Sequence, residues 1–523
     1  MPENQTAAQN QTAAQKAAAA ATQRARDFAL TFESFRDDED AFYVLHQGEA
    51  LSLNSTHCTD IFRSAAMATH TKLPKDSLEL LQTMLREAAR AKPQKAVYRR
   101  IGKDGDANLV DLGDRDRRCA RVDVHGVTVV KSGGAVFSRG KSYGELPEPV
   151  IPTDEAQAWD YIQPLLLGIP KHDQLPLIAV MVERLRSDTA HPILIFIGQE
   201  GSGKSTAAER VMMSIDPFVR KLPSVAHSER WFYSAAQSRH SLALDNLSAS
   251  LKGDLEDALC RSTNGQSITV PELFTTADSR TLRVFVAWTI TGISNQISQA
   301  IRQADTLDRA WVIRVEKPKS YRSTDKLRAE FKSAHGQVLG ALLYFLAERM
   351  RHAPGIEAAQ NIQHRTIDFL VTGEAVAQTI GHVAGSFIAA VERKRSTSAQ
   401  DWLKYDPFGS NVVKCLTELV RTTKVPAPMV GNWKKWQKQP GYSVFQVNGR
   451  VFVAATAEAI LRMVSNATLG LSGKEAACIP TSAPAVADAL DRIQNQMTCG
   501  RWTMRRKQVN GEQNTIWVFG VPR

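Results

Sequence analysis

The pattern that most constrains this chain is a glycine-rich loop between an apolar strand and a helix. Residues 198–205 read Gly-Gln-Glu-Gly-Ser-Gly-Lys-Ser, directly after the apolar run Ile193–Ile197 and before a helical stretch over 205–213. In this strand–loop–helix setting, G-x-x-x-x-G-K-S is typical of a phosphate-binding loop. The glycines let main-chain N–H groups point at phosphates, and the helix N-terminus adds positive potential. The sequence therefore predicts a nucleotide site here, and the flanking strand and helix argue against a chance glycine-rich turn.

The residues of this loop have separate expected roles. Lys204 can reach the β- and γ-phosphates of ATP, and the Ser205 hydroxyl can hold Mg²⁺. ATP and Mg²⁺ are therefore the expected cofactors. The predicted nucleotide contacts are Gly198, Gly201, Ser202, Gly203, Lys204, Ser205 and Thr206.

A second carboxylate is needed on the metal side of such a loop, and Asp245 follows the short apolar run 242–244. We interpret Asp245 as the magnesium partner of Ser205, with a simple turn start as the alternative. Asn246 stands where many such ATPases have a glutamate that activates water. An amide can position water but cannot accept a proton at neutral pH, so the sequence leaves the general base open.

Four apolar runs indicate the fold of this region. They have the length and β-branched content of buried strands and alternate with helical stretches; the runs are Ile193–Ile197, 242–244, 284–291 and 310–315. A helical stretch over 173–186 precedes them, and two more, over 324–350 and 373–393, follow them. This alternation predicts an α/β fold with a parallel sheet covered by helices. Asn295 follows the third run at the carboxyl edge, where ligands bind in open α/β sheets. We interpret it as a sensor of the γ-phosphate, with a turn former as the alternative.

The chain length of 523 residues is too great for one ordinary core, so several domains are expected. The predicted order, divided at composition changes and at the proline-rich linker 147–152, is a disordered tail over 1–24, an α+β domain over 25–150, a P-loop core over 151–320, a helical region over 321–395 and a basic, winged-helix-like domain over 396–523. No stretch approaches ~20 apolar residues, and the six cysteines are scattered without a C-x-x-C pair. We therefore expect a cytoplasmic protein with no membrane segment, disulfide framework or structural zinc.

The C-terminal quarter is the most basic part of the chain. Residues 396–523 carry 16 Lys or Arg against 8 Asp or Glu, which gives them +8 of the formal net charge of +11. Neutralising backbone phosphates releases counterions, so such a domain favours nucleic-acid binding. Aromatic residues alternate with the predicted contacts, which are Lys434, Lys435, Arg505, Arg506 and Lys507. Trp433 and Trp436 fit base stacking and one core face of a helix equally well.

The order of these motifs resembles the superfamily 3 helicases, a branch of the AAA+ ATPases. The resemblance rests on 198–205, 242–246, the Gly265 region, 290–295 and Leu307-Asp-Arg-Ala310, and it covers about 159–315 well. It is closest to ATP-binding replication proteins of prophages and mobile elements, related to poxvirus-type primase-helicases. Residues 41–149 are similar to the N-terminal region of those proteins, with weaker motifs.

The resemblance implies a hexameric ring with DNA in its central pore. A β-hairpin between the Asp245 and Asn295 strands would meet the DNA, with Arg280 and Arg283 as phosphate contacts. The tip lacks a lysine, and an ordinary solvated hairpin fits the sequence equally well. An arginine that reaches the ATP of the neighbouring subunit is also implied; Arg309 matches best and Arg302 second. A structural ion pair of Arg309 with Asp305 is the alternative.

The resulting functional hypothesis is an ATP-driven DNA helicase or replication initiator of a mobile element, acting on single-stranded or forked DNA as a homo-hexamer. The catalytic residues would be Lys204, Asp245, Asn246, Asn295 and Arg309. The alternative is a non-unwinding AAA+ regulator that binds DNA, or a phage-defence ATPase. A small-molecule P-loop kinase ranks last, because it gains nothing from the basic C-terminal region.

Overall fold

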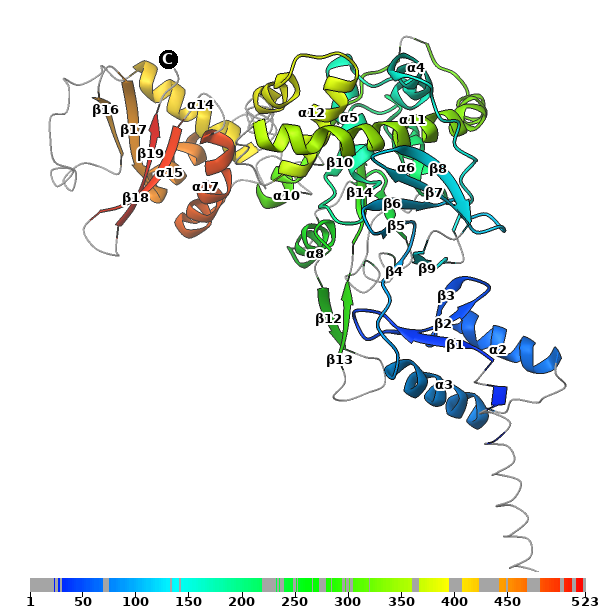
Figure 1. Ribbon diagram of the computed structural model, residues 1–523. Coiled ribbons are helices and arrows are strands. Elements are labelled where there is room, and N and C mark those ends of the chain that lie inside the picture. The colour runs from blue at the N-terminus through cyan, green and yellow to red at the C-terminus, as the bar shows by residue number, and fades with distance from the viewer. Residues whose placement is uncertain are drawn as a thin grey trace, which may run out of the picture.

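The computed structural model is shown in Figure 1. The structure describes residues 31–68, 75–131, 134–140, 143–218, 239–247, 253–265, 267–271, 279–283, 285–293, 304–318, 320–359, 366–394, 407–422, 442–447, 450–467, 480–498, 503–509 and 514–520, with a few single positions between them. The disordered tail predicted over 1–24 lies outside these residues, except for the single position Gln23.

The central body is built on a four-stranded parallel sheet. Its order is β11 (Ser241–Leu244), β14 (Ala287–Gly292), β10 (Ile193–Ile197) and β15 (Ala310–Arg314). All three pairings are parallel, so the carboxyl ends of the strands share one edge. The parallel sheet predicted from the four apolar runs is confirmed.

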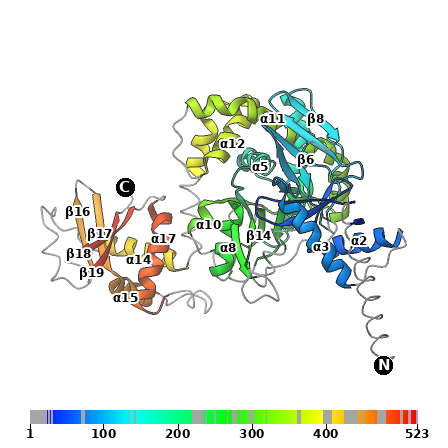
Figure 2. The same ribbon diagram turned by 60° about the horizontal axis from the view of Figure 1, so that its bottom comes forward.

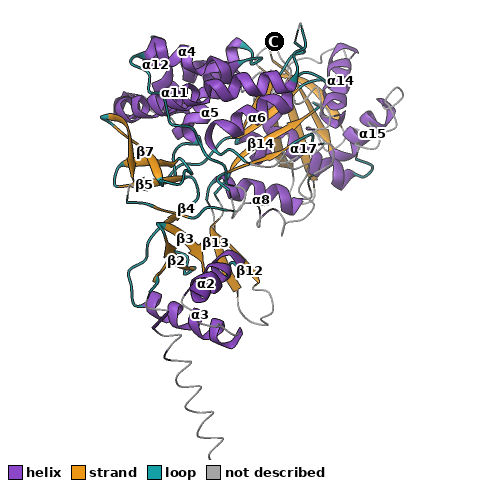
Figure 3. Ribbon diagram, turned by 90° about the vertical axis from the view of Figure 1, so that its right-hand side faces the viewer, coloured by secondary structure: helices purple, strands orange, loops and turns teal. Residues whose placement is uncertain are grey.

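Helices cover both faces of this sheet. Successive residues of a strand point to opposite faces, so each strand contributes side chains to both cores. On one face, Leu194 and Phe196 pack in a large core with α4 (Glu155–Leu166), α5 (Lys171–Glu183), α6 (Lys204–Ile215), α11 (Thr324–Ala359) and α12 (Ile367–Thr379). On the other face, Ile193, Ile195 and Ile197 belong to a core with residues of α8 (Gly253–Thr263) and with Leu307 of α10 (Ala304–Asp308). Figure 3 shows α4, α5, α11 and α12 gathered on one side of the core.

One predicted helix is interrupted. The helix expected over 373–393 is two helices, because α12 ends at Thr379 and a second helix runs over 386–394. Gly381 and Gly385 between them both have φ of 83°, a left-handed conformation that ends helices and that glycine adopts without steric cost. The helix expected over 324–350 is longer than predicted and continues to Ala359.

The N-terminal region contains two sheets among its described residues. The first has the order β1 (Glu33–Arg36), β2 (Phe42–His46), β3 (Glu49–Ser52), β9 (Val136–Phe137) and β4 (Val97–Tyr98), flanked by α2 (Thr56–Ala68) and α3 (Lys75–Arg90). The second is an antiparallel meander of β5 (Ile101–Asp104), β6 (Ala107–Asp111), β7 (Arg118–Asp123) and β8 (Gly126–Lys131). Val110, Ala120 and Val122 of the meander belong to the same hydrophobic core as α4, α5 and α11. The meander is therefore packed onto the central body.

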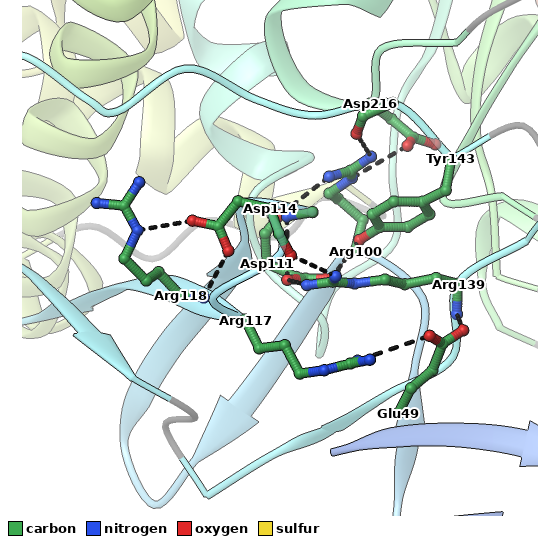
Figure 4. A network of polar contacts seen from close by, with 11 residues as sticks. Glu49, Arg100, Asp111, Asp114, Arg117, Arg118, Arg139, Tyr143 and Asp216 are labelled. Atoms are coloured by element: carbon green, nitrogen blue, oxygen red, sulfur yellow. Dashed lines mark hydrogen bonds and ion pairs between the residues drawn. The ribbon is translucent and has the colours of Figure 1, made fainter. Parts of the chain in front are cut away.

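A buried polar network joins the meander to the sheet (Figure 4). The fully buried Arg100 donates from Nε to Asp216 Oδ1 at 3.1 Å, and its guanidinium lies 3.5 Å from the ring centroid of Tyr143. Asp216 caps the C-terminus of α6, and its other oxygen accepts from the main-chain N–H groups of His240 and Ser241 at the start of β11. Arg100 thus links the meander to the end of α6 and to the strand that carries Asp245.

A β-hairpin follows α8, between the Asp245 strand and β14, where the family resemblance implied one. Its strands are β12 (Ser267–Pro271) and β13 (Ser279–Arg283), paired antiparallel from Ser267↔Arg283 to Pro271↔Ser279. Figure 1 shows the hairpin beyond α8, away from α11 and α12. Arg280 and Arg283 lie on β13, and the structure describes their main chain but not their side chains.

The C-terminal region forms a separate body with its own core (Figure 2). Its elements are α14 (Pro407–Thr422), β16 (Tyr442–Val447), β17 (Arg450–Thr456), α15 (Ala457–Ala467), α17 (Ala483–Thr498), β18 (Thr503–Val509) and β19 (Asn514–Gly520). The strands form an antiparallel sheet of order β16-β17-β19-β18. The three helices pack on one face through residues such as Leu416, Ile460, Leu490 and Trp517. β18 and β19 pair antiparallel from Thr503↔Gly520 to Val509↔Asn514.

Within the described part of the chain, no single helix is long and apolar enough to cross a membrane, although the bent pair α4 and α5 passes that test by length and composition.

Candidate functional site

The glycine-rich loop joins β10 to α6 at the carboxyl edge of the sheet, and three of its positions require glycine. Gly201 and Gly203 have φ of 74° and 90°, in the left-handed region. A Cβ on Gly198 would lie 2.4 Å from the main-chain oxygen of Val315 and 2.7 Å from Ser202 Oγ. The pattern in the sequence is thus explained by the loop conformation and by its close approach to the end of β15.

Lys204 is the first residue of α6 and points back over the loop. Its Nζ donates to the main-chain oxygens of Gly198 at 3.0 Å and Gln199 at 2.7 Å. The side chain is buried, which lowers the pKa of Lys204, while the carboxylates of Asp245 and Glu200 act in the opposite direction. The ammonium group therefore sits inside the loop, at a helix N-terminus that already favours anions.

Ser205, Asp245 and Thr291 meet at the end of the sheet. Ser205 Oγ donates to Asp245 Oδ1 at 2.8 Å, and Thr291 Oγ1 donates to the same oxygen at 2.6 Å. Ser205 comes from α6, Asp245 follows β11, and Thr291 lies on β14. The predicted pair Ser205 and Asp245 is therefore brought together, with a third hydroxyl that holds the carboxylate in place.

Asn246 has a main-chain conformation that suits its residue type. Its φ is 55°, in the left-handed region that asparagine adopts more readily than other residues with a Cβ. Its N–H donates to Thr291 Oγ1 at 2.8 Å, and its side chain is exposed beside Asp245. A left-handed turn that suits asparagine thus follows the carboxylate.

Thr291 was not assigned a role from the sequence. Thr291 is a polar residue at the carboxyl end of an apolar strand, which is the pattern that could have identified it. The same pattern was instead assigned to Asn295, four residues later. Asn295 lies outside the described residues, so its role stays a prediction.

Arg309 lies at the opposite edge of the sheet from the loop. The next residue, Ala310, pairs with Ile193 at the start of β10, whereas the loop follows Ile197 at its end. The Arg309 guanidinium donates to Asn264 Oδ1 at 2.6 Å, just after α8. The structure therefore does not bring Arg309 to the loop of its own chain.

The predicted nucleic-acid contacts of the C-terminal body differ in their surroundings. Arg505 is exposed on β18, whereas Arg506 forms an ion pair with Asp491 of α17 at 2.6 Å and lies over the ring of Trp517. Lys434 and Lys435 lie outside the described residues, and only the main chain of Lys507 is described. Of these residues, Arg505 is an accessible cation, whereas the charge of Arg506 is engaged by Asp491 and Trp517 of the same body.

The central region of the chain matches the model of a known protein family. Residues 171–386 match the actinomycete integrative conjugative element replication protein. The match runs from α5 past α12 and includes the loop, Asp245, Thr291 and Arg309. The central region is thus similar to a replication protein of mobile elements, while the N-terminal sheets and the C-terminal body lie outside the match. No curated protein sequence matches the chain.

Solved structures give weaker similarities over most of the chain. An SCCmec type IV Cch structure, described as an active helicase, is 11% identical with a TM-score of 0.44, covering 94% of this chain and 93% of its own. The C-terminal region of NrS-1 is 10% identical with a TM-score of 0.35, covering 94% of this chain and 96% of its own. TM-scores of this size establish no common fold, so no function is taken from these structures.

Proposed function

We propose that this chain is an ATP-hydrolysing replication protein of a mobile element that acts on DNA, with a P-loop core of the AAA+ type. The observation that carries the proposal is the meeting of Lys204, Ser205 and Asp245 at the carboxyl edge of the parallel sheet. The family match over residues 171–386 supports the replication role. DNA unwinding by a hexameric ring is the mechanism we favour.

The strand order supports the AAA+ assignment. β14 lies between β10, which leads into the loop, and β11, which carries Asp245. Because β14 lies beside β11, a polar residue at its end can contact the Asp245 carboxylate, and Thr291 is that residue. In this arrangement the sensor strand of the AAA+ type is β14.

The donor set at Asp245 fits a magnesium ion held together with ATP phosphates. Ser205 Oγ and Asp245 Oδ1 are hard oxygen ligands and already lie 2.8 Å apart. Among the described residues no three His, Cys, Asp or Glu side chains gather into a metal site, so the phosphates would complete the shell. When bound, Mg²⁺ neutralises charge on the phosphate oxygens.

The protein groups then have distinct tasks. The loop N–H groups and Lys204 bind the β- and γ-phosphates and stabilise the charge that develops during transfer. Thr291 would hold Asp245 in place, and the exposed Asn246 amide would orient the attacking water without accepting its proton. Hydrolysis would therefore depend on positioning and electrostatics rather than on a strong base.

The Asp245→Asn variant is expected to lose turnover more than nucleotide binding. The substitution removes the negative charge at the proposed magnesium site, while the loop and Lys204 still hold the phosphates. We expect kcat to fall about 10²-fold or more with a small change in the dissociation constant for ATP. Steady-state hydrolysis and calorimetric binding measure the two effects.

A matched control is Asp254→Asn, since Asp254 is an exposed carboxylate in the first turn of α8. That variant should hydrolyse ATP at the wild-type rate. Equal losses of ATP binding and ATP hydrolysis in Asp245→Asn would indicate that Asp245 has only a structural role at the strand end.

The topology of the C-terminal body supports a winged-helix DNA-binding domain. Two helices, α15 and α17, precede the hairpin β18–β19, and β19 also pairs with β17. In winged helices the helix before the hairpin enters the major groove, and the hairpin contacts the backbone. In this proposal α17 reads the groove and Arg505 contacts a phosphate.

Removing residues 396–523 is expected to weaken DNA binding and to flatten its dependence on salt, because the segment carries +8 of net charge. Within the full chain, Arg505→Ala should reduce the slope of log affinity against log salt by about 1. Fluorescence anisotropy over a salt series measures both effects.

The control for this experiment is Arg506→Ala, which removes a cation engaged with Asp491 and Trp517. It should lower the thermal stability of the C-terminal body, with a smaller effect on the slope of log affinity against log salt. An unchanged slope of log affinity against log salt after removal of 396–523 would indicate that the DNA contacts lie on the β12–β13 hairpin or in the N-terminal region.

A further inference from the structure

The two elements that hold Ser205 and Asp245 run in opposite directions. Ser205 lies at the start of α6 and Asp245 follows β11, so these residues meet at the carboxyl edge of the sheet. The other ends meet at the amino edge, where Asp216 follows α6 and Ser241 begins β11. α6 has 12 residues and is ~18 Å long, so a shift or tilt at its C-terminus also moves its N-terminus. The spacing of Ser205 and Asp245 therefore depends on the contacts at the amino edge.

Asp216 makes the contact between α6 and β11 at the amino edge. Its N–H donates to the main-chain oxygen of Met212 at 2.9 Å, at the end of α6. Its Oδ2 accepts from the main-chain N–H groups of His240 at 3.2 Å and Ser241 at 3.0 Å. Asp216 is only 3% exposed. A buried carboxylate needs a compensating positive charge as well as hydrogen bonds, because an unpaired charge in the interior is costly.

Arg100 supplies such a charge from the N-terminal region (Figure 4). Its Nε–H donates to Asp216 Oδ1 at 3.1 Å, and the side chain is fully buried. Its terminal nitrogens donate to the main-chain oxygens of Asp111 at 2.9 Å and Gly144 at 2.7 Å. Arg239 is a further cation that interacts electrostatically with Asp216. The planar guanidinium of Arg100 thus ties Asp216 to the main chain of the N-terminal region.

We propose that Arg100 is a positioning residue for the phosphate site. By holding Asp216 it fixes the end of α6 against the start of β11, and this sets the spacing of Ser205 and Asp245 at the opposite ends. Asp216 lies inside the family match over 171–386 and Arg100 lies outside it, so the N-terminal region completes the geometry of the core. This inference rests on the proposed function, because it takes Ser205 and Asp245 to be the magnesium pair.

The test measures how strongly magnesium supports nucleotide binding to the full-length protein. Calorimetry gives the affinity for AMP-PNP, an ATP analogue that is not hydrolysed, in Mg²⁺ and in EDTA. The ratio of these two affinities reports how well Ser205 and Asp245 hold the metal. The variant Arg100→Lys keeps a positive charge but replaces the planar fork by one ammonium group. Its ratio should fall about tenfold, with the affinity in EDTA unchanged, and kcat for ATP should fall about tenfold as well.

A second variant changes the same contact from the core. Asp216→Asn keeps the size of the side chain and removes the charge that Arg100 balances, so it should lower the ratio by a similar factor. Because the two residues form one contact, the double variant Arg100→Lys with Asp216→Asn should lose no more than the larger single loss. If Arg100→Lys does not fold, Asp216→Asn decides in its place.

The matched control is the ion pair of Arg121 and Asp104 on the same meander. Arg121 Nη1 lies 2.9 Å from Asp104 Oδ2, and both side chains are partly exposed. Arg121→Lys and Asp104→Asn repeat the two substitutions at this pair. Both variants should keep the wild-type ratio and the wild-type kcat.

The outcomes separate this inference from the one beneath it. A wild-type ratio and kcat in folded Arg100→Lys, even with a lower melting temperature, would show that Arg100 only stabilises the fold and would overturn the inference. A loss of about a hundredfold in the double variant, the product of two tenfold losses, would show that Arg100 does not act through Asp216. Either result leaves the phosphate-binding loop intact. Failure of the wild-type protein to bind AMP-PNP, or equal wild-type affinities in Mg²⁺ and EDTA, overturns the proposed nucleotide and magnesium site, and this inference with it.

Discussion

The Lys204→Ala variant is expected to lose ATP hydrolysis, with kcat reduced about 10²–10³-fold or more, while the fold and DNA binding persist. Lys204 contributes its charge to the phosphates, and no apolar packing depends on its end, since Nζ contacts only the main-chain oxygens of Gly198 and Gln199. Alanine is also a good helix former at the start of α6. Steady-state hydrolysis, circular dichroism and anisotropy measure the three properties.

The control for Lys204→Ala is Lys326→Ala, which removes an exposed lysine from the first turn of α11. It should hydrolyse ATP at the wild-type rate. Wild-type hydrolysis in purified Lys204→Ala would rule out the assignment of the loop, because the Lys204 ammonium is the charge that the loop would offer to the phosphates.

The central sheet could be predicted because its information is local. Each apolar run is continuous, and the glycine pattern fixes where one of them meets a helix, so Ile193–Ile197 was predicted with its exact bounds. Asp245 followed from the same logic, as a carboxylate at a strand end. Ser205 and Asp245 are 40 residues apart in sequence, yet Ser205 Oγ lies 2.8 Å from Asp245 Oδ1, because both residues lie at one edge of a parallel sheet.

Contacts that depend on distant packing were not predicted. Arg100 and Asp216 are 116 residues apart, and neither stands in a motif that marks a buried ion pair. The second N-terminal sheet shares its core with α11, which a strand pattern alone cannot show. Thr291 was missed for a related reason: its partner was known only once β14 was placed beside β11.

The long helix over 373–393 was predicted because its apolar periodicity continues through the break. Gly381 and Gly385 were compatible with a helix interior at modest cost, and only the structure shows both in the left-handed conformation. Periodicity reports which face is buried. It does not report where the backbone turns.

The Arg309→Ala variant is expected to bind ATP normally and to hydrolyse it about 10³-fold or more slowly, because Arg309 would act on the ATP of a neighbouring subunit. In its own chain, Arg309 precedes β15 and so lies a full strand, ~16 Å, from the loop edge of the sheet. A guanidinium that far away cannot reach its own site. A ring would place it at the site of the next subunit.

A residue that acts between subunits can be complemented by mixing. Arg309→Ala subunits keep Lys204, and Lys204→Ala subunits keep Arg309, so mixed rings should contain some complete sites and recover part of the ATPase activity. The control is Asn264→Ala, which removes one hydrogen-bond partner of Arg309 but not its charge and should retain most activity. Light scattering should show an oligomer promoted by ATP, a hexamer by resemblance, and a forked duplex should be unwound by it. A strictly monomeric, fully active enzyme would contradict the ring and with it the helicase mechanism, because a monomer offers no second site for Arg309 to complete.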